Sequence, residues 1–133
     1  MKLLSIIVAR NYKGLDVWQL GYELTLKLYK LTETFPESEQ NNLTSQIRRA
    51  STSIPLNIAE GSSRFTKKSD LQFLQYAYGS IKEIQVLLDL SKDLGYIQKN
   101  SYDEVNEDVD KLSRKLFVFI KTVERENFFN WFR

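Results

Sequence analysis

Residues 46–64 read QIRRASTSIPLNIAEGSSR and combine features that a core helix does not need together. Two adjacent arginines, Arg48 and Arg49, precede small residues, and Pro55 lies inside an apolar pattern with helical spacing. Proline lacks an N–H and crowds the carbonyl four residues earlier, so we expect a kinked helix over residues 37–60. Gly61 is a natural stop for that helix.

Two polar residues, Asn57 and Glu60, flank the apolar turn after the proline. The proline frees backbone carbonyls, and the Asn57 side chain can donate to one of them. A lone carboxylate such as Glu60 could act as an acid or base, but it has no second carboxylate nearby in the sequence and no histidine partner. We therefore interpret Pro55, Asn57, Glu60 and Gly61 as a structural motif.

Periodic apolar positions predict three further helices around this one. The first covers residues 15–35, and the third covers about 69–94 and is ended by Gly95. The last opens with a capping box from Ser101 to Glu104 and keeps a 3-4 apolar spacing to residue 123. Short connections make successive helices antiparallel, which predicts an all-α, up-down-up-down four-helix bundle.

Length and composition fit one domain of 133 residues, with 42% hydrophobic side chains to build a core. We divide it into an N-terminal extension (1–12), a four-helix bundle (13–126) and an aromatic C-terminal tail (127–133). The apolar run near the start is too short to span a bilayer and is expected to pack on the bundle or a partner. No histidine and no cysteine are present, which excludes imidazole bases, thiolate nucleophiles and thiolate metal sites.

The charge is balanced overall, at +2, but unevenly distributed. Five basic residues against one acidic residue lie within 46–68, and five acidic residues without a basic one lie within 101–110. The basic side chains are candidate phosphate contacts: Arg48, Arg49, Arg64, Lys67 and Lys68. The alternative for each arginine is an ion pair with acidic groups on a neighbouring helix or subunit, such as Glu60 or the cluster at 103–110. The alternative for the other three is an ordinary solvated loop.

Six short motifs together resemble the bacterial four-helix-bundle proteins encoded in 23S rRNA intervening sequences. The resemblance covers roughly residues 13–125 and rests on LDVWQ (15–19), FPxxE (35–39), QIRRA (46–50), SIPxNIAEG (53–61), FLxxAxGS (73–80) and LGYI (94–97). It implies a homo-oligomer, typically a ring of five subunits. The family is also similar to the accessory protein of diversity-generating retroelements, which binds nucleic acid beside a reverse transcriptase.

These observations lead to two hypotheses for the function. The first is a non-enzymatic, cytoplasmic homo-oligomer that binds nucleic acid, above all structured RNA or an RNA–protein complex, through basic patches repeated around a ring. Its nucleic-acid partner could be RNA or DNA. The alternative is a protein-interaction scaffold whose basic residues serve contacts with other subunits or a partner protein. Neither hypothesis requires a cofactor, a metal ion or a membrane.

Overall fold

The computed structural model describes residues 11–62 and 67–131, and within these ranges the chain is all-α. It contains four α-helices and two single 3-10 turns, and these described ranges hold no strand. The elements are η1 (Tyr12–Gly14), α2 (Asp16–Thr32), η2 (Glu37–Glu39), α3 (Leu43–Ser62), α4 (Lys67–Asp93) and α5 (Lys99–Trp131).

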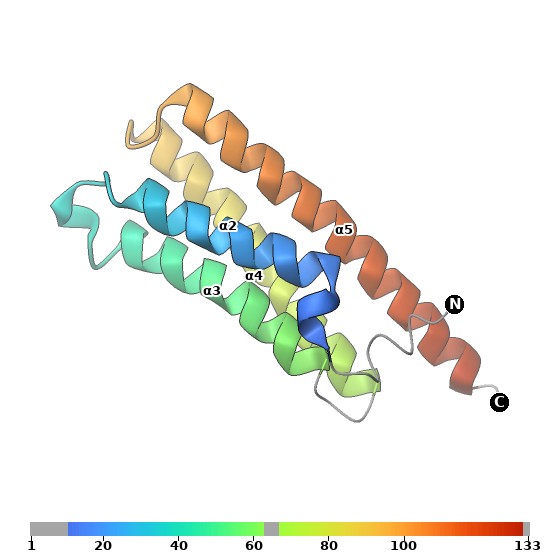
Figure 1. Ribbon diagram of the computed structural model, residues 1–133. Coiled ribbons are helices and arrows are strands. Elements are labelled where there is room, and N and C mark those ends of the chain that lie inside the picture. The colour runs from blue at the N-terminus through green and yellow to red at the C-terminus, as the bar shows by residue number, and fades with distance from the viewer. Residues whose placement is uncertain (1–10, 63–66, 132–133) are drawn as a thin grey trace.

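The four helices form a bundle in which successive helices run in opposite directions (Figure 1). Each helix packs against two others, in the closed order α2, α3, α4, α5 and back to α2. Hydrogen bonds between α2 and α3 show the reversal, since Thr25 contacts Ser51 while the later Thr32 contacts the earlier Arg48. This architecture is the four-helix bundle expected from the apolar spacing.

The apolar faces predicted from the sequence form one core. Each helix contributes side chains that are completely or almost completely buried. The largest are Leu28, Ile47, Ile54, Ile58, Ile81, Ile84, Leu88, Val109, Leu112 and Leu116. Burial of such aliphatic side chains stabilises a fold by about 1.5–3 kcal/mol each, before conformational entropy is counted.

The second helix begins at Leu43 instead of residue 37, because a side chain supplies its first hydrogen-bond acceptor. The Glu39 carboxylate accepts from the backbone N–H of Leu43 at 3.3 Å and from the amide of Asn42 at 3.0 Å. The Tyr96 hydroxyl, from the turn between α4 and α5, donates to the same carboxylate at 3.0 Å. The two turns at this end of the bundle are thereby joined, and α3 starts where its N–H groups find an acceptor.

The expectation that Gly61 stops this helix is wrong, because α3 continues through Gly61 to Ser62. A Cβ at position 61 would lie 3.2 Å from the carbonyl oxygen of Asp70 and 3.4 Å from Cβ of Phe73. Glycine therefore allows α4 to pass close to the end of α3. Gly95 does end its helix as predicted, with a φ of 83° that side chains rarely adopt.

The region around Pro55 shows how a proline is accommodated inside α3. Its missing N–H leaves the Ser51 carbonyl without its helical partner, and the Thr25 hydroxyl of α2 donates to that oxygen at 2.9 Å. The Asn57 amide donates to the Ser53 carbonyl at 2.7 Å. The kink itself stays a prediction. Glu60 lies exposed on the outer side of α3, so it is not the carboxylate in apolar surroundings considered from the sequence.

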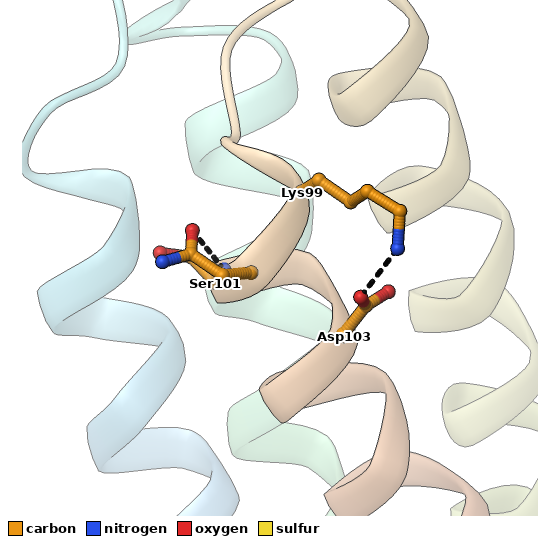
Figure 2. A network of polar contacts seen from close by, with 4 residues as sticks. Lys99, Ser101 and Asp103 are labelled. Atoms are coloured by element: carbon orange, nitrogen blue, oxygen red, sulfur yellow. Dashed lines mark hydrogen bonds and ion pairs between the residues drawn. The ribbon is translucent and has the colours of Figure 1, made fainter.

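The last helix begins at Lys99, two residues before the predicted cap (Figure 2). Instead of a capping box, the Asn100 side chain accepts from the backbone N–H of Ser101 at 2.9 Å, and Lys99 pairs with Asp103 at 2.7 Å. At its other end α5 runs to Trp131, so most of the predicted aromatic tail (127–133) is helical. Most of the N-terminal extension, residues 1–10, lies outside the described residues.

Candidate nucleic-acid interface

Arg48 is partly buried and holds α2 and α3 together. Its Nε donates to the hydroxyl of Thr32 at 2.9 Å, and its Nη2 donates to the backbone carbonyl of Tyr29 at 3.2 Å. The guanidinium carbon lies 4.8 Å from the centre of the Tyr29 ring. Because the last carbonyls of a helix lack helical partners and carry partial negative charge, a cation there stabilises the end of α2. Two of the five guanidinium N–H donors of Arg48 therefore serve the fold.

Arg49 is exposed, and its Nη2 donates to the hydroxyl of Ser45, one turn earlier on the same helix, at 3.1 Å. Consecutive helix positions point about 100° apart, which is why the two arginines face different surroundings. The remaining guanidinium donors of Arg49 face solvent. Arg49 is therefore more open to an external anion than Arg48, which is partly buried.

The other predicted contacts follow α3 in the sequence. Arg49 precedes the end of α3 at Ser62 by about 20 Å of helix. Arg64 falls outside the described residues, and Lys67 and Lys68 form the first turn of α4, where the side chains are not described. Arg48 and Arg49 are therefore the two predicted contacts whose side chains the structure describes.

The acidic stretch 101–110 is largely paired inside the chain. Asp108 binds Lys27 of α2 at 2.6 Å, and this hydrogen bond raises the pKa of the lysine. Asp103 binds Lys99 at 2.7 Å, and Asp110 binds Arg114 at 3.0 Å. In the described ranges Arg48 and Arg49 pair with no carboxylate, so the ion pairs considered as their alternative role are not formed within one chain.

A second tyrosine–carboxylate contact, between α4 and α5, also serves the fold. The Tyr102 hydroxyl donates to the Asp89 carboxylate, which raises the pKa of the tyrosine to about 12, and burial adds to the shift. Lys92 lies 4.3 Å from the centre of the same ring. Over residues 11–62 and 67–131, no three acidic side chains are grouped so that they could hold a metal ion.

Sequence reasoning missed two exposed leucines on the outer faces of α2 and α3. Leu26 is 57% exposed and Leu56 is 67% exposed. Tyr22 stands half-exposed near Leu26 on the outer side of α2 and stacks on Trp18, with ring centres 5.0 Å apart. The sequence could have revealed them, because both leucines lie outside the helical repeat of the positions that face the core. None of the helices in the described part is long and apolar enough to cross a membrane.

Comparison with known proteins agrees with this architecture. The family model described as 23S rRNA-intervening sequence protein matches residues 13–118. A solved structure from Bacteroides thetaiotaomicron VPI-5482 is described as a protein with unknown function from the S23 ribosomal protein family. It is 25% identical, with a TM-score of 0.72, and the match covers 79% of this chain and 98% of that chain. No curated protein matches the chain.

Proposed function

The chain belongs to the family of 23S rRNA-intervening sequence proteins, and we propose that it is a non-enzymatic bundle that binds nucleic acid as an assembly of identical copies. The observation that carries this proposal is the asymmetry of the ion pairs. Three carboxylates of the stretch 101–110 are neutralised within the chain, whereas Arg49 is exposed and meets no carboxylate in the described ranges. A phosphate is the external anion that such a cation binds.

The contacts would be made to the phosphate backbone at separate points. Arg49 would provide one point, and residues 64, 67 and 68, which follow α3 in the sequence, would provide a second one. Two weak points bind poorly alone. Repeating them on each copy of an assembly, such as a ring of five, raises the effective concentration of every further contact once the first is made. Such binding reads charge and shape more than base sequence.

The test is fluorescence anisotropy with labelled structured RNA and with labelled duplex DNA, each at two salt concentrations. Light scattering in the same buffer gives the mass of the assembly. We expect binding that weakens steeply with salt, because each neutralised phosphate releases counterions. Arg49→Glu, and the triple variant Arg64→Glu, Lys67→Glu and Lys68→Glu, should each weaken binding and reduce the salt slope.

A charge-matched control separates a local site from a change in net charge. The triple variant Lys99→Glu, Lys111→Glu and Lys121→Glu changes the same number of charges on exposed positions of α5. It should bind nearly as well as the unaltered protein, since exposed ion pairs contribute little to stability and these positions lie away from α3. Equal losses in both triple variants, or no binding at low salt by an intact assembly, would refute the proposed interface.

A protein-interaction scaffold is the second candidate function, and the exposed leucines favour it. Leu26 and Leu56 leave apolar surface in water that a partner protein could cover. If Arg49→Glu left nucleic-acid binding unchanged while Leu26→Asp and Leu56→Asp abolished assembly or capture of a partner, this second function would take precedence.

A further inference from the structure

Helix α5 is much longer than the helix beside it, and its last part has no α2 alongside. Asp16, the first residue of α2, pairs with Lys115 of α5 at 2.9 Å and marks the level at which α2 begins. From Lys115, α5 continues to Trp131, which is about 24 Å of helix. Figure 1 shows this end of α5 extending beyond the start of α2.

A hollow of about 580 Å³ lies where α2 stops covering α5. One wall is the segment from Gly14 to Val17, and the other includes Val118 and Thr122 of α5. The surface of the hollow is mainly apolar, and Val118 is 62% exposed. The charged groups at its edge are already paired, Asp16 with Lys115 and Arg114 with Asp110. The hollow therefore suits an apolar occupant better than an ion.

The chain itself supplies an apolar segment beside this hollow. Residues 3–8 read LLSIIV, with five apolar side chains out of six. The described chain starts at Asn11, three positions before Gly14 in the wall. Ten extended residues reach about 33 Å, which is enough to follow the uncovered length of α5. The family match covers residues 13–118. Residues 3–8, and most of the part of α5 that lies beyond α2, are therefore outside the match.

We propose that this hollow is the docking site of residues 3–8 of the same chain, which cover the apolar side of α5 beyond α2. Such docking removes several aliphatic side chains and Val118 from water together. The same segment from a second copy, or an apolar segment of another protein, would fit the chemistry of the hollow equally well. The direct connection through Asn11 favours the chain's own segment, because a tethered segment has a high effective concentration.

Disulfide trapping tests the proposal cleanly, because the chain has no cysteine of its own. Val118→Cys is combined in turn with Leu4→Cys, Ile6→Cys and Ile7→Cys, and each protein is oxidised mildly at low concentration. At least one pair should form a bond within a single chain, seen as faster migration without reductant. The control replaces Val118→Cys with Leu26→Cys, which is similarly exposed but lies on the outer face of α2.

Two results of the trapping experiment would overturn the proposal. Covalent dimers in place of closed single chains would assign the hollow to a second copy. Equal bond formation with Leu26→Cys, or no bond in any Val118→Cys pair, would show that the segment does not occupy the hollow.

Hydrogen exchange gives an independent measurement on the protein without engineered cysteines. In a variant that lacks residues 1–10, the amides from Arg114 to Thr122 should exchange about tenfold faster or more, since their apolar cover is gone. The amides of α3 should be unchanged. Ile7→Asp, a milder change, should give the same pattern in part. Unchanged exchange at Arg114–Thr122 in both variants would also overturn the proposal.

Discussion

The hydroxyl of Thr25 donates to the Ser51 carbonyl of α3, in place of the backbone N–H that Pro55 lacks. Pro55 has no N–H, so the carbonyl of Ser51 lacks its helical donor. The hydroxyl oxygen of Thr25 lies 2.9 Å from that carbonyl oxygen and also 2.9 Å from the carbonyl oxygen of Gly21. The Gly21 carbonyl already accepts the backbone N–H of Thr25 in the regular helix pattern. Ser51 is therefore the acceptor that depends on the hydroxyl.

Replacing Thr25 by valine removes the donor with little other change. Valine keeps the branched shape and has a similar helix propensity, so the effect on α2 itself is small. Ser51 is completely buried, and its carbonyl would lose its partner where water cannot readily replace it. An unsatisfied buried acceptor costs about 1–3 kcal/mol. In a chain of this size each kcal/mol lowers Tm by about 3–5 °C.

The assay is urea unfolding followed by circular dichroism at one fixed protein concentration, because self-assembly would shift apparent stability with concentration. Thr52→Val is the matched control. Its hydroxyl donates at 3.0 Å to the Arg49 carbonyl within its own helix, in a hydrogen bond that is exposed to solvent. Losing it should change the free energy of unfolding by about 0.5 kcal/mol or less.

A double-mutant cycle decides whether the bond compensates for the proline. In Pro55→Ala the alanine restores an N–H that can donate to Ser51, so Thr25→Val should then cost only about 0.5 kcal/mol. The two costs would differ by about 1–2 kcal/mol. Equal costs in both backgrounds, or no cost in the unaltered protein, would refute the assignment of the hydroxyl to this carbonyl.

Five further substitutions test other contacts by the same unfolding assay, and the two arginine variants are also measured for nucleic-acid binding. Gly21→Ala should destabilise by about 1–3 kcal/mol, because the new Cβ would lie 2.9 Å from a side-chain atom of α3; Gly79→Ala, with nothing within 4 Å, should instead stabilise by about 0.5–1 kcal/mol. The Tyr96 hydroxyl and backbone N–H bonds lower the pKa of Glu39, so its contribution to stability is present above the ordinary value near 4.5 and is lost as pH falls through the lower folded value. Glu39→Gln should therefore flatten the acid side of the stability profile, and an unchanged profile would contradict this. Arg48→Met should lower stability by about 1–2 kcal/mol without weakening nucleic-acid binding. Arg49→Met should weaken nucleic-acid binding and leave stability unchanged. A loss of binding in Arg48→Met would contradict these roles.

The sequence predicts the bundle well because burial follows the helical period. Leu28, Ile47 and Leu112 fall on the predicted apolar faces and are fully buried. Helix ends were harder to predict, since they depend on side chains distant in sequence. The start of α3 depends on Glu39, which is held from the α4–α5 turn, and periodicity carries no information on such a contact.

The candidate interface was only partly predictable for the same reason. The pair at positions 48 and 49 is visible in the sequence, and so is the angle between its members. Arg48 donates hydrogen bonds to the hydroxyl of Thr32 and to the carbonyl of Tyr29, both at the end of α2. Nothing in the sequence indicates that Arg48 binds the end of α2. Arg49 is therefore the more accessible candidate phosphate contact of the two arginines, while Arg48 also holds α2 and α3 together.

The distribution of ion pairs also predicts how the proposed assembly and the proposed binding respond to salt. Two copies of the chain could associate by pairing Arg49 of one copy with the stretch 101–110 of the other. Each such pair would replace an exposed ion pair within the chain. This exchange would change the free energy of association by only about 0–1 kcal/mol. Covering the exposed part of Leu26 or Leu56, which is 57% or 67% of the residue, contributes about 1–2 kcal/mol each. Assembly should therefore persist from 50 mM to 500 mM salt in light scattering, while nucleic-acid binding falls by orders of magnitude over about the same range. Dissociation of the assembly in step with the loss of binding would show instead that charges hold the copies together.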